Sequence, residues 1–469
     1  MKVIDFLMKL LWGDLLFLPL PGGGKIGVCL LVLILIPAGI YFTVRTKLLP
    51  IRCFPEMLRI SVEKGQGKSG SLSGMQTLIV STATRVGMGN LVGVVAAISA
   101  GGAGAVFWMW ITALIGASTA YVEATLAQKY KEPDPLYGGT RGGPAYYIHS
   151  FFTRGKQRRW HIMAVLFALS GLLCWSGVAQ VIGNSVSDAF YQAFDMPAIV
   201  TTVILVGISA VIVLRKNATV KVLDIVVPIM AAAYFLAALF VMVKNIGLMP
   251  SVFRRIFEEA FGIRQVVAGG FGAALMNGVK RGLFSNEAGS GSAPCAAAAA
   301  EVSHPAKAGL FQAFGVIIDT IIICTCTAMI MLLAPEELIS GLEGMELLQT
   351  AMRHHFGQVG VVFSAVTLWL FSFSTFIGVL FYARSNVAYL LGDHWWGQTL
   401  YKIFALAMLF VGGLAAYSFV WDLGDIGIAL STVFNMIAII PMSGQAIRAL
   451  NDYTAMRKRE KAEKKGIKE

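Results

Sequence analysis

The tetrapeptide Gly87-Met88-Gly89-Asn90 interrupts an apolar run that otherwise extends from about Leu78 to Ala100. A second glycine-rich stretch, Gly269–Gly272 (GGFG), lies inside another apolar segment in the second half of the chain. Glycine weakens a helix interior by about 1 kcal/mol relative to alanine, so both segments are predicted to be broken helices. In lipid, a break is tolerated only where the freed backbone groups line a cavity in the protein. Two such segments at corresponding places in two halves are typical of a transporter binding site.

The composition places the chain in a membrane. Of its 469 residues, 57% are hydrophobic and 14% are charged, and the mean hydropathy is +0.71, whereas a soluble domain has about 25% charged residues. The apolar segments are about 18–28 residues long, which suits α-helices crossing a hydrocarbon core about 30 Å thick and not the short strands of a β-barrel. No cleavable signal is expected, because Gly22–Gly24 precedes the first long apolar run and no cleavage site follows it.

The net charge of +12 lies largely in loops beside apolar segments and in the C-terminal tail. This placement is typical of cytoplasmic loops that obey the positive-inside bias, so the lipid bilayer is expected as a partner and nucleic acid is not. The six cysteines fit neither a disulfide framework nor a zinc site. No catalytic triad, nucleotide motif or transition-metal cluster is present in the sequence, so an enzyme is not expected.

The alternation of basic loops predicts eleven membrane spans, with the N-terminus outside and the C-terminus in the cytoplasm. The basic loop from Arg45 to Lys68 sets this orientation, and the later basic loops agree with it. The segment Lys244–Arg264 fits least well, because Arg254 and Arg255 would lie outside. The predicted spans are about Ile26–Val44, Gly74–Ala100, Ala105–Gln128, Ile162–Val186, Ile199–Leu214, Val222–Val243, Gln265–Phe284, Leu310–Leu333, Val359–Tyr382, Lys402–Tyr417 and Leu423–Ile447.

Without the first span, ten remain, and five spans in each half turn the second half upside down relative to the first. The broken helices then begin the two halves, which is the arrangement of an inverted repeat with a binding site near the membrane midplane. The predicted fold class is an all-α polytopic membrane protein with a 5+5 inverted repeat and one extra N-terminal helix. Its parts are residues 1–73 (lead-in, extra helix and basic loop), 74–243 (first repeat), 265–447 (second repeat) and 448–469 (basic cytoplasmic tail).

The glycines of Gly87–Gly93 are not a dinucleotide fingerprint, because the third glycine is one place late and no strand frames them. In a broken membrane helix, freed backbone N–H groups at a positive helix end can hold a carboxylate, and freed carbonyl groups can hold a cation. A carboxylate bound together with a monovalent cation indicates an amino acid cotransporter.

Five stretches carry a resemblance to a known family: Val86–Gly93, Gly102–Leu114, Gly142–Ile148, Arg281–Pro294 and Ile318–Ile322. They resemble the alanine/glycine:cation symporters, also called the sodium:alanine symporter family, and they span most of the chain in the expected order. The resemblance implies a LeuT-like core of ten helices plus one extra, in the inner membrane of a prokaryote. It further implies that a small neutral amino acid such as alanine or glycine is imported with sodium by alternating access.

The resemblance also implies residue roles. The substrate carboxylate would bind main-chain groups of the first broken helix, and the ammonium group would bind carbonyl groups of the second. Sodium, the only metal expected and the coupling ion, would bind an oxygen cage suited to a hard cation. The implied substrate residues are Met88, Gly89, Asn90, Gln180, Ala268, Gly269, Phe271, Thr375 and Val379; the implied sodium residues are Ala83, Val86, Asn90, Ser374 and Thr375.

Each of these side chains also has a structural alternative. The glutamine can bond a neighbouring helix, the hydroxyl groups can bond their own helix, and the phenylalanine can pack in the core. Two positions depart from the family. Met88 stands where relatives usually have threonine, and Val379 stands where they commonly have tryptophan, so a larger pocket and a longer neutral substrate such as glutamine or asparagine are expected.

Ionisable side chains inside the membrane are functional suspects, because a charge at mid-bilayer costs about 2.5–3.5 kcal/mol or more. Asp319, about half-way through its span, is a candidate proton or cation site, or else a buried hydrogen-bonding group. Glu123 and Glu287 are expected to pair with Lys129 and Arg281. Proton coupling through Asp319 or Glu123 is therefore one alternative function, and a membrane sensor or channel that binds amino acid without transporting it is another.

Overall fold

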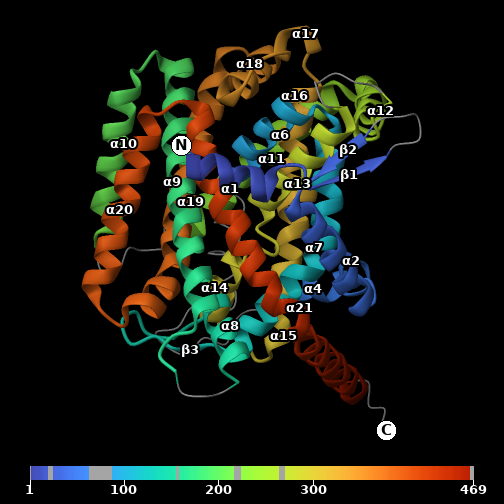
Figure 1. Ribbon diagram of the computed structural model, residues 1–469. Coiled ribbons are helices and arrows are strands. Elements are labelled where there is room, and N and C mark those ends of the chain that lie inside the picture. Colours follow the sequence, from blue (N-terminus) through green and yellow to red (C-terminus); the bar gives the residue numbers. More distant parts are fainter. Residues whose placement is uncertain are drawn as a thin grey trace.

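The computed structural model of the chain describes residues 2–19, 25–62, 87–154, 158–215, 223–263 and 270–464. Within these ranges the protein is helical apart from two small antiparallel hairpins (Figure 1). The first hairpin pairs β1 (Leu16–Pro19) with β2 (Lys25–Val28), and the second pairs β3 (Glu132–Pro133) with β4 (Thr140–Arg141). The all-α membrane class predicted from the composition is confirmed.

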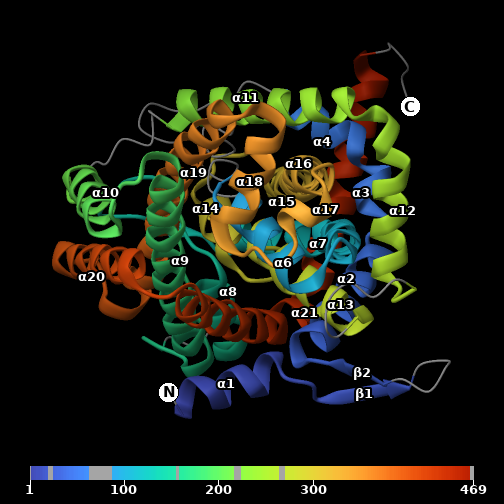
Figure 2. The ribbon, with the colours of Figure 1, turned by 90° about the horizontal axis from the view of Figure 1, so that it is seen from above.

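Helix α1 and the first hairpin lie along one side of the helix bundle, and the next N-terminal helices follow around the adjacent side (Figure 2). Helix α1 packs on α21, and the indole Nε1 of Trp12 donates to the carbonyl oxygen of Asp425 across 3.0 Å. The first predicted span begins four residues later than expected, because β2 occupies the start of the apolar run. These elements are α1 (Lys2–Trp12), α2 (Leu30–Arg45), α3 (Leu49–Arg52) and α4 (Phe54–Val62).

The helices that follow form two sets with a similar order. The described part of each set begins with a distorted or interrupted helix, and in each set a short helix precedes a long helix of 33 or 34 residues. The first set comprises η1 (Gly89–Gly93) with α6 (Val94–Gly101), α7 (Gly104–Lys129), α8 (Pro144–Thr153), α9 (Ile162–Phe194), α10 (Ala198–Val213), α11 (Leu223–Lys244), η3 (Ile246–Leu248) and α12 (Met249–Ala260).

The second set has a similar order and extends to the end of the described chain, although nothing in it corresponds to η3 and α12. Its long helix α19 has 34 residues, and α9 of the first set has 33. The set comprises α13 (Gly270–Asn286) with α14 (Ser292–Ala299), the continuous span of α15 (Pro305–Val316), η4 (Ile317–Cys324) and α16 (Thr325–Leu332), then α17 (Glu336–Ile339), α18 (Gly344–Phe356), α19 (Gln358–Leu391), α20 (Trp395–Leu414) and α21 (Tyr417–Lys464).

Six helices in the described ranges are long and apolar enough to cross a membrane, or seven if one bent pair counts as a span. Three shorter apolar helices, Leu30–Arg45, Gly89–Gly101 and Ala198–Val213, accompany them. The predicted number of eleven therefore stays a prediction. The connection predicted at Lys244–Arg264 contains the helix α12, which follows α11 after a bend of 74°.

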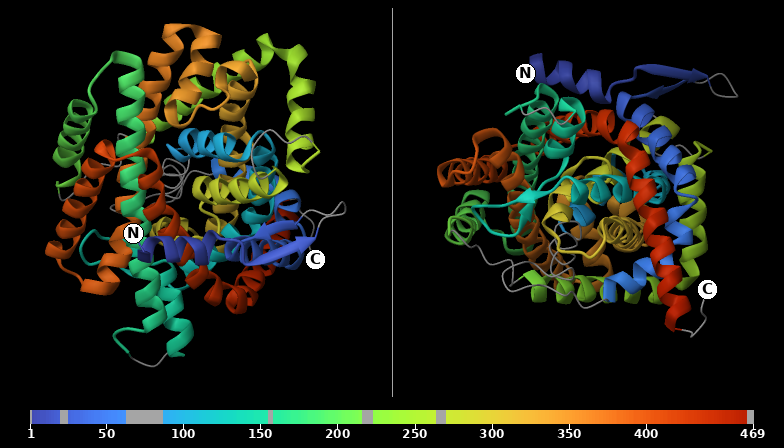
Figure 3. Two further views of the ribbon diagram at one scale, coloured as in Figure 1. Left: turned by 45° about the horizontal axis from the view of Figure 1, so that its top comes forward. Right: turned by 90° about the horizontal axis from the view of Figure 1, so that it is seen from below.

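Small residues allow the helices around α9 to approach closely, as they do in other membrane bundles. Helix α9 packs on α19, α20 and α21 (Figure 1). A Cβ atom added at Gly177 would come within 2.2 Å of the backbone nitrogen of Gly424, so a side chain there would separate α9 from α21. At the periphery, α10 and α20 lie side by side (Figures 2 and 3).

Helix α21 continues beyond the predicted end of its span at Ile447, and it projects from the body of the protein (Figure 1). Part of the predicted basic tail is therefore helical. This extension is held at α4, since Tyr453 donates to Glu56 across 2.6 Å and Arg457 pairs with the same carboxylate at 3.1 Å.

Candidate substrate and cation site

The first broken segment is a buried turn that contacts α19. The backbone N–H of Met88 donates to Thr375 Oγ1 across 3.2 Å, and the next five residues form the π-helical turn η1. Every residue from Met88 to Gly93 is buried. π-helical turns are rare and often occur at functional sites. This turn lies in the glycine-rich stretch that the sequence marked as a break. The predicted sodium residues Ala83 and Val86 lie outside the described residues.

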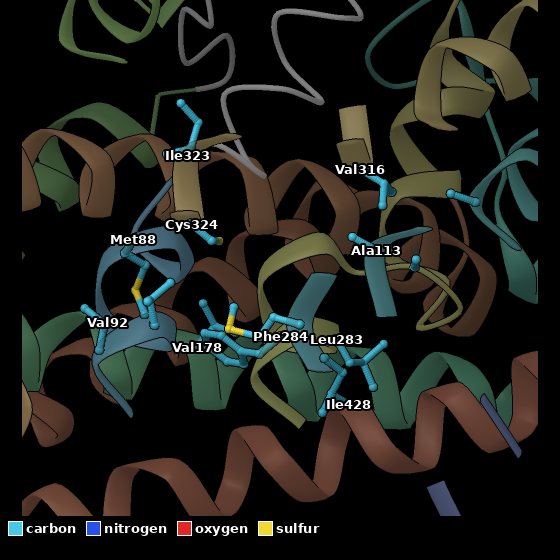
Figure 4. Packing of buried hydrophobic residues seen from close by; sticks show 14 of the residues in the cluster. Met88, Val92, Ala113, Val178, Leu283, Phe284, Val316, Ile323, Cys324 and Ile428 are labelled. Carbon is cyan, nitrogen blue, oxygen red and sulfur yellow. The ribbon is translucent and has the colours of Figure 1, made fainter. Parts of the chain in front are cut away.

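The C-terminal part of α13 faces this turn. A Cβ atom added at Gly89 would lie 3.4 Å from the Cα of Ser285, and one added at Gly93 would lie 3.6 Å from the ring of Phe284. Figure 4 shows Met88 in the same apolar cluster as Phe284. The first broken segment is therefore in direct contact with the end of α13 through its glycines, Gly89 and Gly93.

A buried polar cluster lies at this contact. Ser285 Oγ is 3.1 Å from Asn90 Oδ1, 2.7 Å from Asp319 Oδ2 and 3.1 Å from Cys324 Sγ. Thr320 Oγ1 also donates to Asp319 Oδ2, across 2.9 Å. Asp319, Thr320 and Cys324 belong to η4, so this cluster joins η1, α13 and a second π-helical turn.

The break in the second broken helix lies between α13 and α14, at Glu287–Gly291. Glu287, Gly289 and Gly291 have φ angles of 56°, 96° and 82°, which do not fit the interior of a right-handed helix. The predicted break at Gly269–Gly272 is wrong for the described part of that stretch, because α13 begins at Gly270 and runs through Phe271 and Gly272. The predicted substrate residues Ala268 and Gly269 lie outside the described residues.

Side chains from distant elements satisfy the backbone groups that this break frees. The N–H of Gly289 donates to Glu123 Oε1 across 3.2 Å. Asn435 Nδ2 donates to Glu123 Oε2 and to the carbonyl oxygen of Gly289, both across 2.9 Å, and Tyr147 donates to Asn435 Oδ1. In lipid such groups must find partners within the protein. The expected pairing of Glu123 with Lys129 is wrong, since the carboxylate binds the break.

A buried charge cluster anchors α13 to α21. Arg281 donates to both carboxylate oxygens of Asp425, across 3.0 and 3.2 Å, and Lys280 Nζ lies 2.7 Å from Asp425 Oδ2. The guanidinium group also stacks over the ring of Trp421 at 3.8 Å. The expected pairing of Arg281 with Glu287 is therefore wrong. Both basic side chains are largely enclosed by the protein, with 13% of Lys280 and 8% of Arg281 exposed.

The remaining predicted site residues lie at different places. Phe271 is on the first turn of α13, about four turns or roughly 20 Å from Ser285 along the helix, and its ring contacts Trp108 at 5.7 Å between centroids. Gln180 is buried on the face of α9 toward α20, where its Nε2 lies 3.6 Å from Met408 Sδ. The structure therefore does not bring Phe271 beside the first broken segment.

The predicted residues on α19 divide in two. Thr375 binds the first broken segment, whereas Ser374 Oγ donates to the carbonyl oxygen of Phe371 in its own helix across 2.8 Å. Val379 is buried one turn further along. Thus the structure brings together Met88, Gly89, Asn90 and Thr375.

Sequence reasoning missed several residues of this region. Ser285 lies inside the specific run Arg281–Pro294 and could have been found there, because it is a polar residue in an apolar segment. Asn435 and Asp425 lie in the last predicted span. Their polar side chains within an apolar segment were the only sign in the sequence that they could have a role. Their partners are 146 and 144 residues away in the sequence.

Comparison with known proteins assigns the chain to a family. Residues 24–467 match the family model described as "Sodium:alanine symporter family". The chain belongs to this family. Its members are cation-coupled amino acid carriers, so this protein is a multi-pass membrane transporter and not an enzyme, as the sequence predicted.

Members of the sodium:alanine symporter family with curated names are similar to this chain over nearly its whole length. "Amino-acid carrier protein AlsT" of Bacillus subtilis is 41% identical, with 91% of this chain and 89% of that protein covered. "Probable sodium/glutamine symporter GlnT" of the same organism is 41% identical, with 92% and 88% covered. "Sodium/alanine symporter AgcS" of Methanococcus maripaludis is 33% identical, with 92% and 95% covered.

Solved structures of two other transporters resemble the structure of this chain. The crystal structure of MhsT in complex with L-phenylalanine matches with a TM-score of 0.55 over 81% of this chain and 89% of that one, at 13% identity. A manganese transporter of Eremococcus coleocola matches with a TM-score of 0.50 over 83% and 82%, also at 13% identity. The chain therefore has a fold similar to that of the LeuT-fold transporters.

Proposed function

We propose that this protein is a sodium-coupled symporter that imports a small neutral amino acid by alternating access. The observation that carries the proposal is the buried turn Met88–Asn90, which contacts Thr375 on α19 and Ser285 on α13. This turn joins one element from the first set of helices to two from the second, at a π-helical distortion. Membership in a family of amino acid carriers supports the reading of this turn as the transport site.

The substrate carboxylate binds the backbone N–H groups of Met88 and Gly89 at the start of the distorted helix, whose dipole favours negative charge there. In the present arrangement the N–H of Met88 donates to Thr375 Oγ1. A carboxylate that binds this N–H therefore replaces the threonine hydroxyl, which becomes available to a cation or to the substrate. Asn90 lies next to this position, on the side of Ser285.

Sodium binds beside the same turn, at Ser374 and Thr375 together with carbonyl groups of the first broken helix near Ala83 and Val86. The hydroxyl of Thr375 within 3.2 Å of the Met88 nitrogen supports this placement, because α19 and the turn are in contact there. Two relatives whose names include sodium support the choice of ion. Proton coupling is the second candidate, favoured by the buried carboxylate of Asp319 and by a relative named a sodium/proton-dependent alanine carrier.

We further propose the 5+5 inverted arrangement, with residues 74–243 and 265–447 as its repeats. The corresponding helix lengths of the two sets support it, above all the 33 residues of α9 and the 34 residues of α19. The proposed orientation, with the N-terminus outside and the C-terminus in the cytoplasm, follows from the basic loops and the basic end of α21. The first span, α2, is then the extra helix.

The substrate is proposed to be alanine, glycine or a longer neutral amino acid such as glutamine. Val379 is buried and smaller than the tryptophan that the family resemblance leads us to expect at this position, which favours a longer substrate, and relatives are named both for alanine and for glutamine. Competition against labelled alanine with a panel of amino acids tests this part. Glutamine should compete in the natural protein and lose that ability in Val379→Trp, whereas competition by glycine and alanine alone would contradict a longer substrate.

Uptake into proteoliposomes tests the function itself. Labelled alanine and labelled glutamine are supplied in parallel, with an inward sodium gradient or with potassium in its place, at two external pH values. Accumulation that needs sodium supports the symporter. Accumulation that follows the pH gradient alone supports proton coupling, and binding without uptake supports a sensor.

A further inference from the structure

We propose that Arg215, Arg384 and Lys402 bind the phosphate of an anionic phospholipid at the end of the bundle where α10, α19 and α20 meet. The inference goes beyond the proposed function, because it assigns a lipid partner to residues that take no part in the proposed binding of amino acid or sodium. Arg215 follows the C-cap of α10, Arg384 belongs to α19 and Lys402 belongs to α20. The basic loops place this end of the helices in the cytoplasm.

The first observation is that two cationic side chains lie at the same depth on neighbouring helices. Helix α19 ends at Leu391 and α20 begins at Trp395. Arg384 and Lys402 therefore each lie about two turns, or roughly 10 Å, from the connection between the helices. Helix α20 approaches Arg384, since Gln398 Nε2 donates to the carbonyl oxygen of Arg384 across 3.1 Å. The charges of Arg384 and Lys402 act on each other, so an anion near both is favourable.

The second observation is that neither cation pairs with a carboxylate among the side chains that the structure describes. Lys402 is 8% exposed, and its Nζ lies 3.5 Å from the carbonyl oxygen of Arg215 at the end of α10. The carboxylates of Asp134 and Asp393 pair with Arg141 instead. A charge enclosed at this depth is costly unless it is paired. The two cations are therefore suited to an anion from outside the chain.

The surroundings of Arg384 leave its donors available. Its Cζ lies 3.9 Å from the ring centre of Tyr137 and 5.1 Å from that of Phe381. A guanidinium group that stacks on a ring still presents its N–H groups in its own plane, where they match the oxygens of a phosphate. The hydroxyl of Tyr137 is also buried, and it has no hydrogen-bond partner in the described part of the chain. A phosphate beside this ring accepts hydrogen bonds from both groups.

The rim of the site suits a lipid more than a free anion. Arg215 is exposed, and so is Trp396 on the first turn of α20, a residue type that is enriched at membrane interfaces. Helices α10 and α20 lie side by side at the periphery (Figures 2 and 3). Their exposed apolar side chains near this end are Val211, Leu214, Leu400, Ile403 and Phe404. An acyl chain along this face holds the phosphate at the level of the cations.

The site differs from the basic end of α21. Lys458 and its basic neighbours there are exposed, so they attract anionic lipids only through the general field at the membrane surface. Lys402 is enclosed, and hydrogen bonds between charged groups are stronger where water is excluded. A phospholipid between α10, α19 and α20 therefore stays bound when the bulk lipid is removed, whereas lipid near α21 does not.

The experiment measures lipid binding by the purified full-length protein, without transport. A ligand that binds the folded state raises the melting temperature, so this temperature is followed during titration with phosphatidylglycerol, phosphatidylcholine or inorganic phosphate. Native mass spectrometry counts the phosphatidylglycerol molecules that remain bound. The natural protein is compared with Arg215→Gln, Arg384→Gln, Lys402→Met and Lys402→Arg. Lys458→Gln is the matched control, because it removes one exposed positive charge from the end of α21.

The site predicts that phosphatidylglycerol raises the melting temperature of the natural protein, and that phosphatidylcholine and inorganic phosphate do so much less. Arg215→Gln, Arg384→Gln and Lys402→Met should each raise the half-saturating phosphatidylglycerol concentration at least several-fold and lose the retained lipid. Lys402→Arg keeps the charge and should retain the lipid, and Lys458→Gln should behave as the natural protein. Arg215→Gln changes only the exposed rim, so the test stays decisive if variants of the enclosed cations do not fold.

A phosphatidylglycerol response that is unchanged in Arg215→Gln and Lys402→Met would overturn the site. An equal response to phosphatidylcholine would also overturn it, because apolar contact alone would then suffice, and an equal response to inorganic phosphate would show that no lipid is needed. Sodium-driven uptake is measured separately. Its absence in the natural protein would contradict the proposed function and would leave the lipid site in place.

Discussion

The two broken helices solve the same problem in different ways. In the described part of the first, the turn at Gly87–Met88 leads into the π-helical η1, which runs on into α6, and a hydroxyl of α19 binds the N–H of Met88. In the second, helix ends outright at Asn286, three residues take positive φ angles, and α14 begins at Ser292. There a carboxylate and an amide from α7 and α21 satisfy the backbone.

The difference teaches that the energetic demands of the two breaks are unequal. The second break needs charged and amide side chains from two other helices, together with an ion pair that holds α13 to α21. At the first break, one hydroxyl group accepts a backbone hydrogen bond, and glycines without side chains let α13 pack closely. We therefore expect the second break to be the rigid anchor of the site and the first to be the part that responds to ligands.

The largest expected effect concerns the anchor of α13. Asp425→Asn removes one partner of a buried ion pair and leaves Arg281 and Lys280 without their carboxylate, which costs about 3–5 kcal/mol. The melting temperature of the detergent-solubilised protein should fall steeply. Asp452→Asn is the control, because this side chain is 80% exposed and forms a surface pair with His304, so the variant should change little. Equal melting temperatures for the two variants would contradict an anchoring role.

The next effect concerns the carboxylate at the second break. Glu123→Gln turns one acceptor into a donor that faces Gly289 N–H or Asn435 Nδ2, and it removes charge-assisted hydrogen bonds worth about 1.5–3 kcal/mol each. We expect a clear loss of thermal stability together with reduced uptake. Glu132→Gln, on the exposed strand β3, is the control. If Glu123→Gln were as stable as the natural protein, the break would not depend on this carboxylate.

Replacing a glycine of the second break by alanine should likewise cost more stability than replacing one of the first. Gly289→Ala places a side chain at φ 96°, where its Cβ would lie 2.5 Å from Met436 Cε, so strain of about 1–3 kcal/mol is expected. Gly89→Ala adds a Cβ at ordinary contact distance, 3.4 Å from Ser285, and should cost less stability. Thermal melting of both variants checks the order. A larger loss for Gly89→Ala would reverse the comparison.

The smallest expected effect is at the first break. Thr375→Val removes the acceptor of the buried Met88 N–H, which should cost about 1 kcal/mol of stability. Thr375→Ser keeps the hydroxyl and should restore most of the loss, which a purely steric role of the methyl group would not allow. Melting temperature and sodium-driven uptake are measured for both variants. Identical behaviour of valine and serine would show that the hydroxyl is not needed.

In the described residues, the sequence marked the distorted turn at Gly89–Gly93 well and the second break poorly, for a physical reason. Local glycine content marked Gly87–Asn90 and Gly269–Gly272 alike, but glycine only permits a break. What creates one is a set of partners for the freed backbone groups, and Glu123 and Asn435 lie 166 and 146 residues from Gly289. Such long-range contacts leave no local signal. The motif Glu287–Gly291, with its alternating glycines, was the available local sign.

The same reasoning explains the site residues. Thr375 could be predicted because a family pattern places a hydroxyl opposite the first break, and the structure brings the two together. Phe271 could not be placed correctly, since its distance from the turn follows from where α13 begins. The partners of the ionisable groups were assigned to the nearest charges in sequence, whereas Arg281 and Glu123 bind groups on α21.

The central claim is that the first broken segment and the end of α13 meet through Asn90 and Ser285 to form one site. A double-mutant cycle tests it most directly, with alanine binding measured at saturating sodium in the natural protein, Asn90→Ala, Ser285→Ala and the double variant. Residues in contact show coupling energies of about 0.5–3 kcal/mol, so the double variant should bind more tightly than the two single losses predict together. Losses that add to within about 0.3 kcal/mol would contradict the contact.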